Sequence, residues 1–370
     1  MTHPWIAERM AHFDSSGIRK VFDLAAHLKN PINLSIGQPD FDVPPAIQQA
    51  AIEAITGGRN GYSPTQGAAA LRDKLQTKID EQYGHGDRRV FVTSGTSGGL
   101  MLAALAIVNP GDEVIVFDPY FVVYPSLVEM AGGRMVLIDT YPDFRIDLNR
   151  LESAITSRTK AIIFASPANP TGVTASAAEV RAIAELAARH NVALISDEIY
   201  NTFQYDEPFV SPAKFNDQTL VVDGFSKTYA MTGWRIGFAH GPAAIIHEMA
   251  KLQQYTFVCA PQPFQWASIA ALEVDMQPYI DTYRKKRDRI IAGLKDDYEI
   301  VHPGGAFYVF PKVPDGAATQ FVERGIQREL LVIPGNIFSK RDTHIRISYA
   351  ATDETIDRGI AVLRELARGK

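Results

Sequence analysis

The chain has 370 residues, of which 46% are hydrophobic and 21% are charged, and its net charge at pH 7 is −5. This length and composition are ordinary for a globular protein with one large domain and one smaller domain. The small negative charge gives no electrostatic reason to expect nucleic acid or an anionic membrane as a partner. The single cysteine, Cys259, excludes an internal disulfide and fits a reducing compartment.

The first 45 residues show no strong sheet pattern and contain four prolines between positions 31 and 45. We expect residues 1–45 to form an N-terminal segment that packs on the smaller domain. The first twenty residues are mixed and charged and lack the apolar core of a secretion signal. The longest apolar stretches, such as Leu100–Val108, are too short to span a membrane. A cytoplasmic protein is therefore expected.

Between about residues 90 and 240, apolar runs of strand length alternate with segments of helical spacing such as Ala175–His190. Near-continuous apolar strands separated by helices are typical of an α/β domain whose mostly parallel sheet is covered on both faces. We expect this large domain to comprise residues 46–280. Its predicted strands are Arg89–Thr93, Glu113–Phe117, Met135–Asp139, Ala161–Ala165, Val192–Ser196, Leu220–Asp223 and Trp234–Ala239.

The last 90 or so residues show a different pattern. A long charged helix over about Gln277–Leu294 is followed by three strand-like segments and a closing helix over about Asp353–Arg368. This succession predicts a smaller α+β domain over residues 281–370. The strand-like segments are Ala306–Phe310, Leu330–Pro334 and His344–Ser348.

The residues that follow each strand are the candidates for a site, because ligands bind outside the carboxyl ends of the strands in open parallel sheets. The first strand is followed by Ser94–Gly99, six small residues that open a helix. Free N–H groups at a helix N-terminus suit a phosphate, although small residues also cap helices for structural reasons. Asn169, Asp197, Tyr200 and Lys227 follow three further strands.

An amide, a carboxylate, a phenol and an amine are thereby predicted at one edge of the sheet, beside a phosphate cradle. Pyridoxal phosphate requires this set: a lysine for the Schiff base and an acid that faces its pyridinium nitrogen. An amide and a phenol can hydrogen-bond the ring oxygen O3′. The lysine amine, once exchanged with substrate, can act as a general base.

The segment GFSKTYAMTGWRIGF (Gly224–Phe238) closely resembles the lysine motif of the class I/II, fold-type I, pyridoxal-phosphate-dependent aminotransferases. Other landmarks fall in the order that this resemblance requires, and together they span residues 34–348. They are LSIGQPDFDVPP, GYSPTQGAAALR, SGTSGGL, DPYFVVY, ANPTG, SDEIY and HIRIS. The resemblance implies the fold-type I architecture, with a large cofactor-binding domain and a smaller C-terminal one.

For the cofactor ring, the resemblance implies that Lys227 forms the Schiff base and acts as the catalytic base. Asp197 would pair with the pyridine nitrogen. Tyr200 and Asn169 would contact O3′, and Phe121 would stack on the ring or, alternatively, belong to the core. The neighbour of Asp197, Glu198, would point the other way if the strand persists, so it is not assigned a catalytic role.

For the phosphate, the resemblance implies the backbone amides of Gly95, Thr96 and Ser97 together with the Arg235 guanidinium. Many relatives carry a phosphate-binding serine three residues before the lysine, whereas this chain has Gly224 there. Ser226 is the alternative phosphate ligand.

For the substrate, the resemblance implies that Arg346 clamps the α-carboxylate, with Asn169 beside it and a backbone donor from Gly37. Arg346 lies on an alternating strand, where an outward arginine would also be ordinary. Tyr62 matches a tyrosine that reaches the phosphate of the neighbouring subunit, which implies a homodimer with shared active sites. No residue that selects the substrate side chain can be placed, and no metal site is predicted.

The implied activity is transfer of an amino group from an L-amino acid to a 2-oxoacid through the pyridoxal and pyridoxamine forms of the cofactor. Kinetics would be ping-pong, and 2-oxoglutarate is the acceptor that the resemblance implies. The alternative is another reaction on the same scaffold, such as a carbon–sulfur β-lyase, a racemase or a synthase. A non-catalytic, DNA-binding regulator would need an additional basic module, for which the N-terminus has neither room nor charge.

Overall fold

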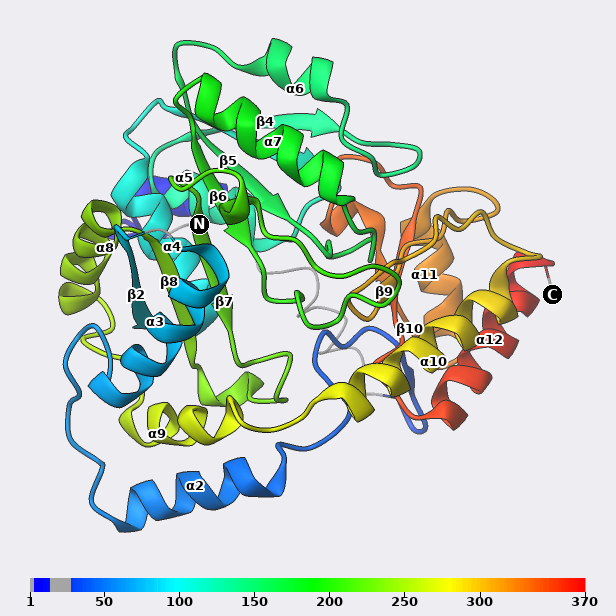
Figure 1. The fold of residues 1–370 in the computed structure, drawn as a ribbon. Helices are drawn as coiled ribbons and strands as arrows, with labels where there is room; N and C mark the ends of the chain where they lie inside the picture. The colour runs from blue at the N-terminus through cyan, green and yellow to red at the C-terminus, as the bar shows by residue number, and fades with distance from the viewer. Residues whose placement is uncertain (1–2, 14–27, 85, 370) are drawn as a thin grey trace.

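The computed structural model describes residues 3–13, 28–84 and 86–369. Its main sheet has seven strands in the order β2-β8-β7-β6-β5-β3-β4 (Figure 1). Six strands run parallel, and β8 is antiparallel to both of its neighbours. The carboxyl ends of the six parallel strands therefore meet at one edge. The strands are β2 (Arg88–Thr93), β3 (Glu113–Asp118), β4 (Arg134–Asp139), β5 (Thr159–Ala165), β6 (Ala193–Asp197), β7 (Leu220–Gly224) and β8 (Gly237–Pro242).

Helices cover both faces of this sheet, as the apolar strands require. In β3, Val114 and Val116 pack in one core cluster with α4, α5 and α8, whereas Ile115 packs in another with α6 and α7. This alternation is the two-residue period of a strand that is buried on both faces. The helices of the two layers are α4 (Gly95–Ile107), α5 (Val123–Met130), α8 (Ala243–Tyr255), α6 (Leu148–Ala154) and α7 (Ala177–Arg189).

A third helical group packs near the end of the sheet that carries β2 and β8 (Figure 1). Val90, Val92 and Ile236 share a core cluster with these helices. The helices are α2 (Pro45–Thr56), α3 (Ala69–Tyr83) and α9 (Gln262–Ala271). Of the described helices, none is long and apolar enough to span a membrane.

The C-terminal part has its own small sheet, in the antiparallel order β11-β12-β9, with three helices beside it (Figure 1). The N-terminal strand β1 pairs in parallel with β10. This pairing attaches the described segment that precedes α2 to the C-terminal part. Its elements are β1 (Ile32–Asn33), β9 (Tyr308–Val309), β10 (Leu330–Leu331), β11 (Ile333–Pro334), β12 (Ile345–Ser348), α10 (Gln277–Leu294), α11 (Ala318–Ile326) and α12 (Asp353–Ala367). Residues 1–2 and 14–27 of the predicted N-terminal segment lie outside the described residues, and the domain bounds stay a prediction.

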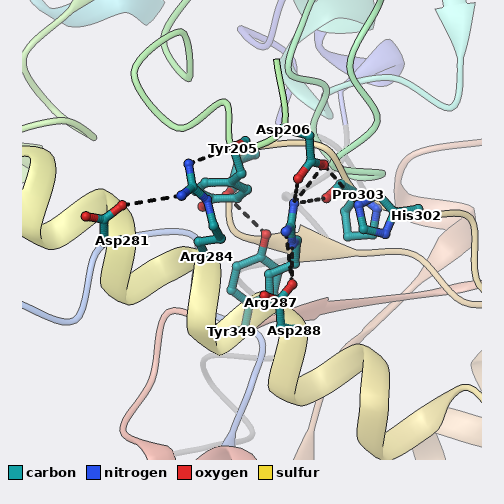
Figure 2. Close-up of polar contacts among 10 residues, drawn as sticks. Tyr205, Asp206, Asp281, Arg284, Arg287, Asp288, His302, Pro303 and Tyr349 are labelled. Carbon is teal, nitrogen blue, oxygen red and sulfur yellow. Dashed lines mark hydrogen bonds and ion pairs between the residues drawn. The ribbon is translucent and has the colours of Figure 1, made fainter. Parts of the chain in front are cut away.

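A polar network joins α10 to the segment that follows β6 in the chain (Figure 2). The Arg287 side chain is only 5% exposed, and its Nη1 donates to both carboxylate oxygens of Asp206 at 2.8 Å. His302 Nε2 lies 3.0 Å from the same carboxylate, and Arg284 donates to the Tyr205 carbonyl at 2.8 Å. These contacts hold α10 against the segment that follows β6, the strand that ends at Asp197.

Four short 3-10 turns complete the described elements, and one of them corrects a predicted strand. We expected a strand over Trp234–Ala239, but residues Thr232–Trp234 form a turn and β8 begins only at Gly237. Arg235 has a φ of +56°, a left-handed conformation that cannot continue into a strand. The other turns are Glu8–His12, Pro212–Lys214 and Gly335–Ile337.

Candidate active site

A cavity of about 360 Å³ opens at the carboxyl edge of the main sheet, where residues of the C-terminal part close over it. It brings together residues from eight separate stretches of the chain. Every residue that the sequence nominated for the site lines this cavity, apart from Gly95 and Tyr62. The lining residues that had been nominated are Gly37, Thr96, Ser97, Phe121, Asn169, Asp197, Tyr200, Ser226, Lys227, Arg235 and Arg346.

Lys227 follows β7 and Asp197 ends the neighbouring strand β6, so adjacent parallel strands deliver the amine and the acid to one place. Loss of solvation, with Arg346 and Arg235 nearby, lowers the pKa of Lys227 to about 8. Burial raises the pKa of Asp197 to about 6, and the Tyr124 hydroxyl, the Ile199 amide and the charge of Lys227 oppose this rise. Lys227 Nζ donates to the Gly37 carbonyl at 2.5 Å.

Asp197 is held by a residue that sequence reasoning missed. The hydroxyl of Tyr124, on α5, donates to Asp197 Oδ2 at 2.9 Å, and the Ile199 amide donates to Oδ1 at 3.3 Å. Tyr124 is buried and lines the cavity. Tyr124 is the last residue of the DPYFVVY motif. It follows Phe121 by three residues at the start of α5, a spacing that places two side chains on the same side of a helical turn, and this spacing could have predicted its place in the site.

Tyr200 contacts Tyr308, a second site residue that was not predicted from the sequence. Its hydroxyl lies 2.8 Å from the hydroxyl of Tyr308, which belongs to β9 of the small sheet. Tyr308 also lines the cavity, and the Arg346 guanidinium carbon lies 4.5 Å from the centre of its ring. The strand-like pattern of Ala306–Phe310 located the strand but gave no indication of which residue would reach the site.

Beside Thr96 and Arg235, at the predicted phosphate site, glycines pack closely against polar groups. Gly95 has a φ of +70°, and an added Cβ there would lie 2.5 Å from Arg235 Nη2. The buried Thr96 Oγ1 finds no hydrogen-bond partner among the described residues. An added Cβ at Gly224 would lie 2.8 Å from this oxygen, so the Thr96 hydroxyl occupies the space beside the position where relatives carry a serine.

Arg346 is only 1% exposed, although it lies on a strand where an outward arginine had been an open alternative. Its Nη1 donates to Asn169 Oδ1 at 3.1 Å and its Nη2 to the Ser35 carbonyl at 2.8 Å. Its Nε is buried without a partner in the described part of the chain. A buried guanidinium with an unused donor is suited to binding an anionic group.

Three further residues were considered in the sequence: Phe121, Tyr62 and Glu198. Phe121 lines the cavity and packs edge-on against Tyr124, with ring centres 5.6 Å apart. Tyr62 is 85% exposed and does not line the cavity of its own chain in the described residues. Glu198 points away, with its carboxylate accepting from Ser211 at 2.6 Å, and burial raises its pKa to about 7.

Comparisons with known proteins agree with this geometry. Residues 29–363 match the family model described as aminotransferase class I and II. The chain is 37% identical to a probable aspartate aminotransferase of Methanocaldococcus jannaschii, over 98% of this chain and 99% of that protein. It is 33% identical to aromatic-amino-acid aminotransferase 2 of Thermococcus litoralis, over 97% and 98%. The structure of Thermus thermophilus aspartate aminotransferase with maleate superposes with a TM-score of 0.94 at 33% identity, over 98% of this chain and 100% of that one.

Proposed function

This chain belongs to the class I and II aminotransferase family and is an aminotransferase of the fold-type I architecture, and we propose that Lys227 carries its cofactor, pyridoxal 5′-phosphate. One observation supports the proposal above the others. Lys227, Asp197 and the pair Thr96 and Ser97 line a single cavity, although they follow three separate strands.

The residues present fit this cofactor. Thr96 Oγ1, buried and unpaired in the described chain, and Arg235 offer donors at the end where a phosphate would lie. The Asp197 carboxylate lines the same cavity and would pair with a pyridinium nitrogen. When bound, pyridoxal phosphate supplies an electron sink that allows an amino group to leave one carbon skeleton and join another.

Lys227 would serve as the point of attachment and then as the base that moves the Cα proton. An amine attacks only in its neutral form, and an ordinary lysine is almost fully protonated at pH 7. With a pKa of about 8, roughly a tenth of Lys227 side chains are neutral at that pH. The same lowered pKa suits a general base that works near neutrality.

Asn169 and Arg346 would place the substrate carboxylate. Because the amide oxygen of Asn169 accepts from Arg346, its NH₂ group is left to donate into the cavity. Arg346 Nε and the adjoining nitrogens offer a carboxylate the forked geometry that arginine provides. The only contact recorded for Gly37 in the described site is through its carbonyl, so its role as a backbone donor stays a prediction.

The reaction we propose takes an amino group from an L-amino acid and delivers it to a 2-oxoacid, with 2-oxoglutarate as the acceptor. Relatives are named for aspartate and for aromatic amino acids, so the donor is left open between these classes. A cytoplasmic location remains the expectation from composition.

The test begins with the purified protein and added pyridoxal 5′-phosphate. We expect a visible absorption band that amino-acid substrates bleach, and we expect Lys227→Ala to lack the linkage that produces it. Adding single L-amino acids and then 2-oxoglutarate identifies the donor and checks the acceptor. A protein that stays colourless with added cofactor would contradict the proposal. Release of pyruvate and ammonia without an acceptor would indicate a β-lyase instead.

We also propose a homodimer in which Tyr62 reaches the neighbouring subunit's phosphate site. Support comes from the position of Tyr62, which is 85% exposed and does not line the cavity of its own chain in the described residues. Mixing Lys227→Ala subunits with Tyr62→Ala subunits should give heterodimers in which one site has both native residues. Recovery of activity on mixing supports shared sites, and no recovery contradicts them.

A further inference from the structure

Tyr308 contacts Tyr200 and Arg346, which are the residues proposed to bind the cofactor ring oxygen and the substrate carboxylate. It lies on β9 and is 1% exposed. Its hydroxyl is 2.8 Å from that of Tyr200, and its ring faces the Arg346 guanidinium carbon at 4.5 Å from the ring centre. The hydroxyl also lies 2.8 Å from the place where a Cβ on Gly37 would be, so it fills the wall next to the Lys227 contact.

The direction of the hydrogen bond between the two phenols decides what Tyr200 can do. A phenol has one proton, so a Tyr200 that donates to Tyr308 has nothing left to donate into the cavity. Burial raises the pKa of both tyrosines, and the charge of Arg346 opposes the rise in both. The Arg346 guanidinium carbon lies over the Tyr308 ring, 4.5 Å from its centre, and this nearby positive charge favours Tyr308 as the donor of the pair.

We propose that Tyr308 is a positioning residue of the active site: its hydroxyl donates to Tyr200 and its ring supports Arg346. The Tyr200 proton is thereby turned toward the cavity. Accepting one hydrogen bond strengthens the next one in the chain, so Tyr200 becomes a better donor to a ring oxygen of the cofactor. The aromatic face holds the guanidinium of Arg346 by a cation–π contact in a dry environment.

This inference rests on the proposed function, and two variants separate the two roles. Tyr308→Phe keeps the ring and removes the hydroxyl, whereas Tyr308→Leu removes both. The first measurement is the pH midpoint at which the visible band of the lysine-bound cofactor changes. Donation from Tyr200 to the ring oxygen stabilises negative charge there and lowers this midpoint, so weaker donation should raise it. The second measurement is the Kd of propionate, an unreactive carboxylate, titrated against the same band.

For Tyr308→Phe we expect the pH midpoint to rise by about half a unit, with the propionate Kd changed less than about twofold because the ring remains. For Tyr308→Leu we expect the same rise in midpoint and a propionate Kd weakened by about tenfold. Tyr349→Phe is the matched control. Tyr349 is buried in the same small sheet region, donates to the Ala306 carbonyl at 3.1 Å and does not line the cavity among the described residues.

An unchanged midpoint in Tyr308→Phe, or an equal shift in Tyr349→Phe, overturns the role of the hydroxyl. An unchanged propionate Kd in Tyr308→Leu overturns the role of the ring. A wild-type protein without the visible band overturns the proposed function itself, which distinguishes that failure from a failure of this inference. Should Tyr308→Leu not fold, Tyr308→Met provides the second comparison, because it also lacks an aromatic face.

Discussion

Replacing Tyr124 with phenylalanine should weaken cofactor binding relative to the wild type at pH 7, and this weakening should fade as the pH rises toward 9. The substitution removes the hydroxyl that donates to Asp197 Oδ2 at 2.9 Å and leaves the buried ring in place. A hydrogen bond to a charged group contributes about 1.5–3 kcal/mol, which corresponds to roughly one to two pKa units. The pKa of Asp197, about 6 in the cofactor-free protein, should therefore rise to between about 7 and 8.

The consequence follows from the fraction of ionised Asp197, the form that pairs with a pyridinium nitrogen. At pH 7 this fraction is about nine-tenths for a pKa of 6, and it falls to between about a half and a tenth in Tyr124→Phe. The Kd for pyridoxal 5′-phosphate should weaken by about two- to tenfold at pH 7 from this ionisation alone, and recover near pH 9.

The assay is a titration of cofactor-free protein with pyridoxal 5′-phosphate at several pH values between 6 and 9. Lys227 also titrates in this range, but it does so in both proteins, so the ratio of the variant Kd to the wild-type Kd isolates Asp197. Tyr120→Phe is the control, because Tyr120 belongs to the same segment and its charged neighbour is Asp118 instead. A ratio that stays constant across the pH range would refute the reasoning.

Three other substitutions test further parts of the site. Lys227→Met should stabilise the cofactor-free protein at pH 7 by up to about 3 kcal/mol, since the native pKa of about 8 lies below the ordinary value of 10.5. The free energy of unfolding of the wild type then rises from about pH 8 to pH 10.5, because the unfolded wild-type chain binds more protons than the folded one there. Urea unfolding should therefore show a difference in stability between variant and wild type that shrinks over this pH range. Arg346→Lys should raise the KM of the amino donor by about ten- to a hundredfold through loss of the forked contact, and an equal loss of cofactor affinity would mean that the arginine is misassigned. Gly224→Ser should weaken cofactor binding by about tenfold, since its Cβ would lie 2.8 Å from Thr96 Oγ1 and 3.1 Å from Gly237 Cα; an unchanged Kd in a titration with pyridoxal 5′-phosphate would argue against this close packing.

Much of the fold could be predicted because each pattern has a local physical cause. The strands of the main sheet are buried on both faces, so they appear in the sequence as apolar runs. Their observed bounds differ from the prediction by at most two residues, apart from β8, whose start and end both lie three residues later. Helix α10 was located at Gln277–Leu294 because its apolar residues recur at helical spacing within a charged segment. The start of β8 was wrong because a left-handed Arg235 leaves no signal in a run of strand-forming residues.

The sequence by itself determined the chemistry of the site. Parallel strands end at one edge, so Asn169, Asp197 and Lys227 had to meet there whatever the details of packing. Only the tertiary structure decided how those groups are held. Tyr308 comes from a different sheet, and the burial of Arg346 depends on how that sheet closes over the first. Such contacts join residues more than 100 positions apart, and no local pattern of the chain encodes which side chains meet.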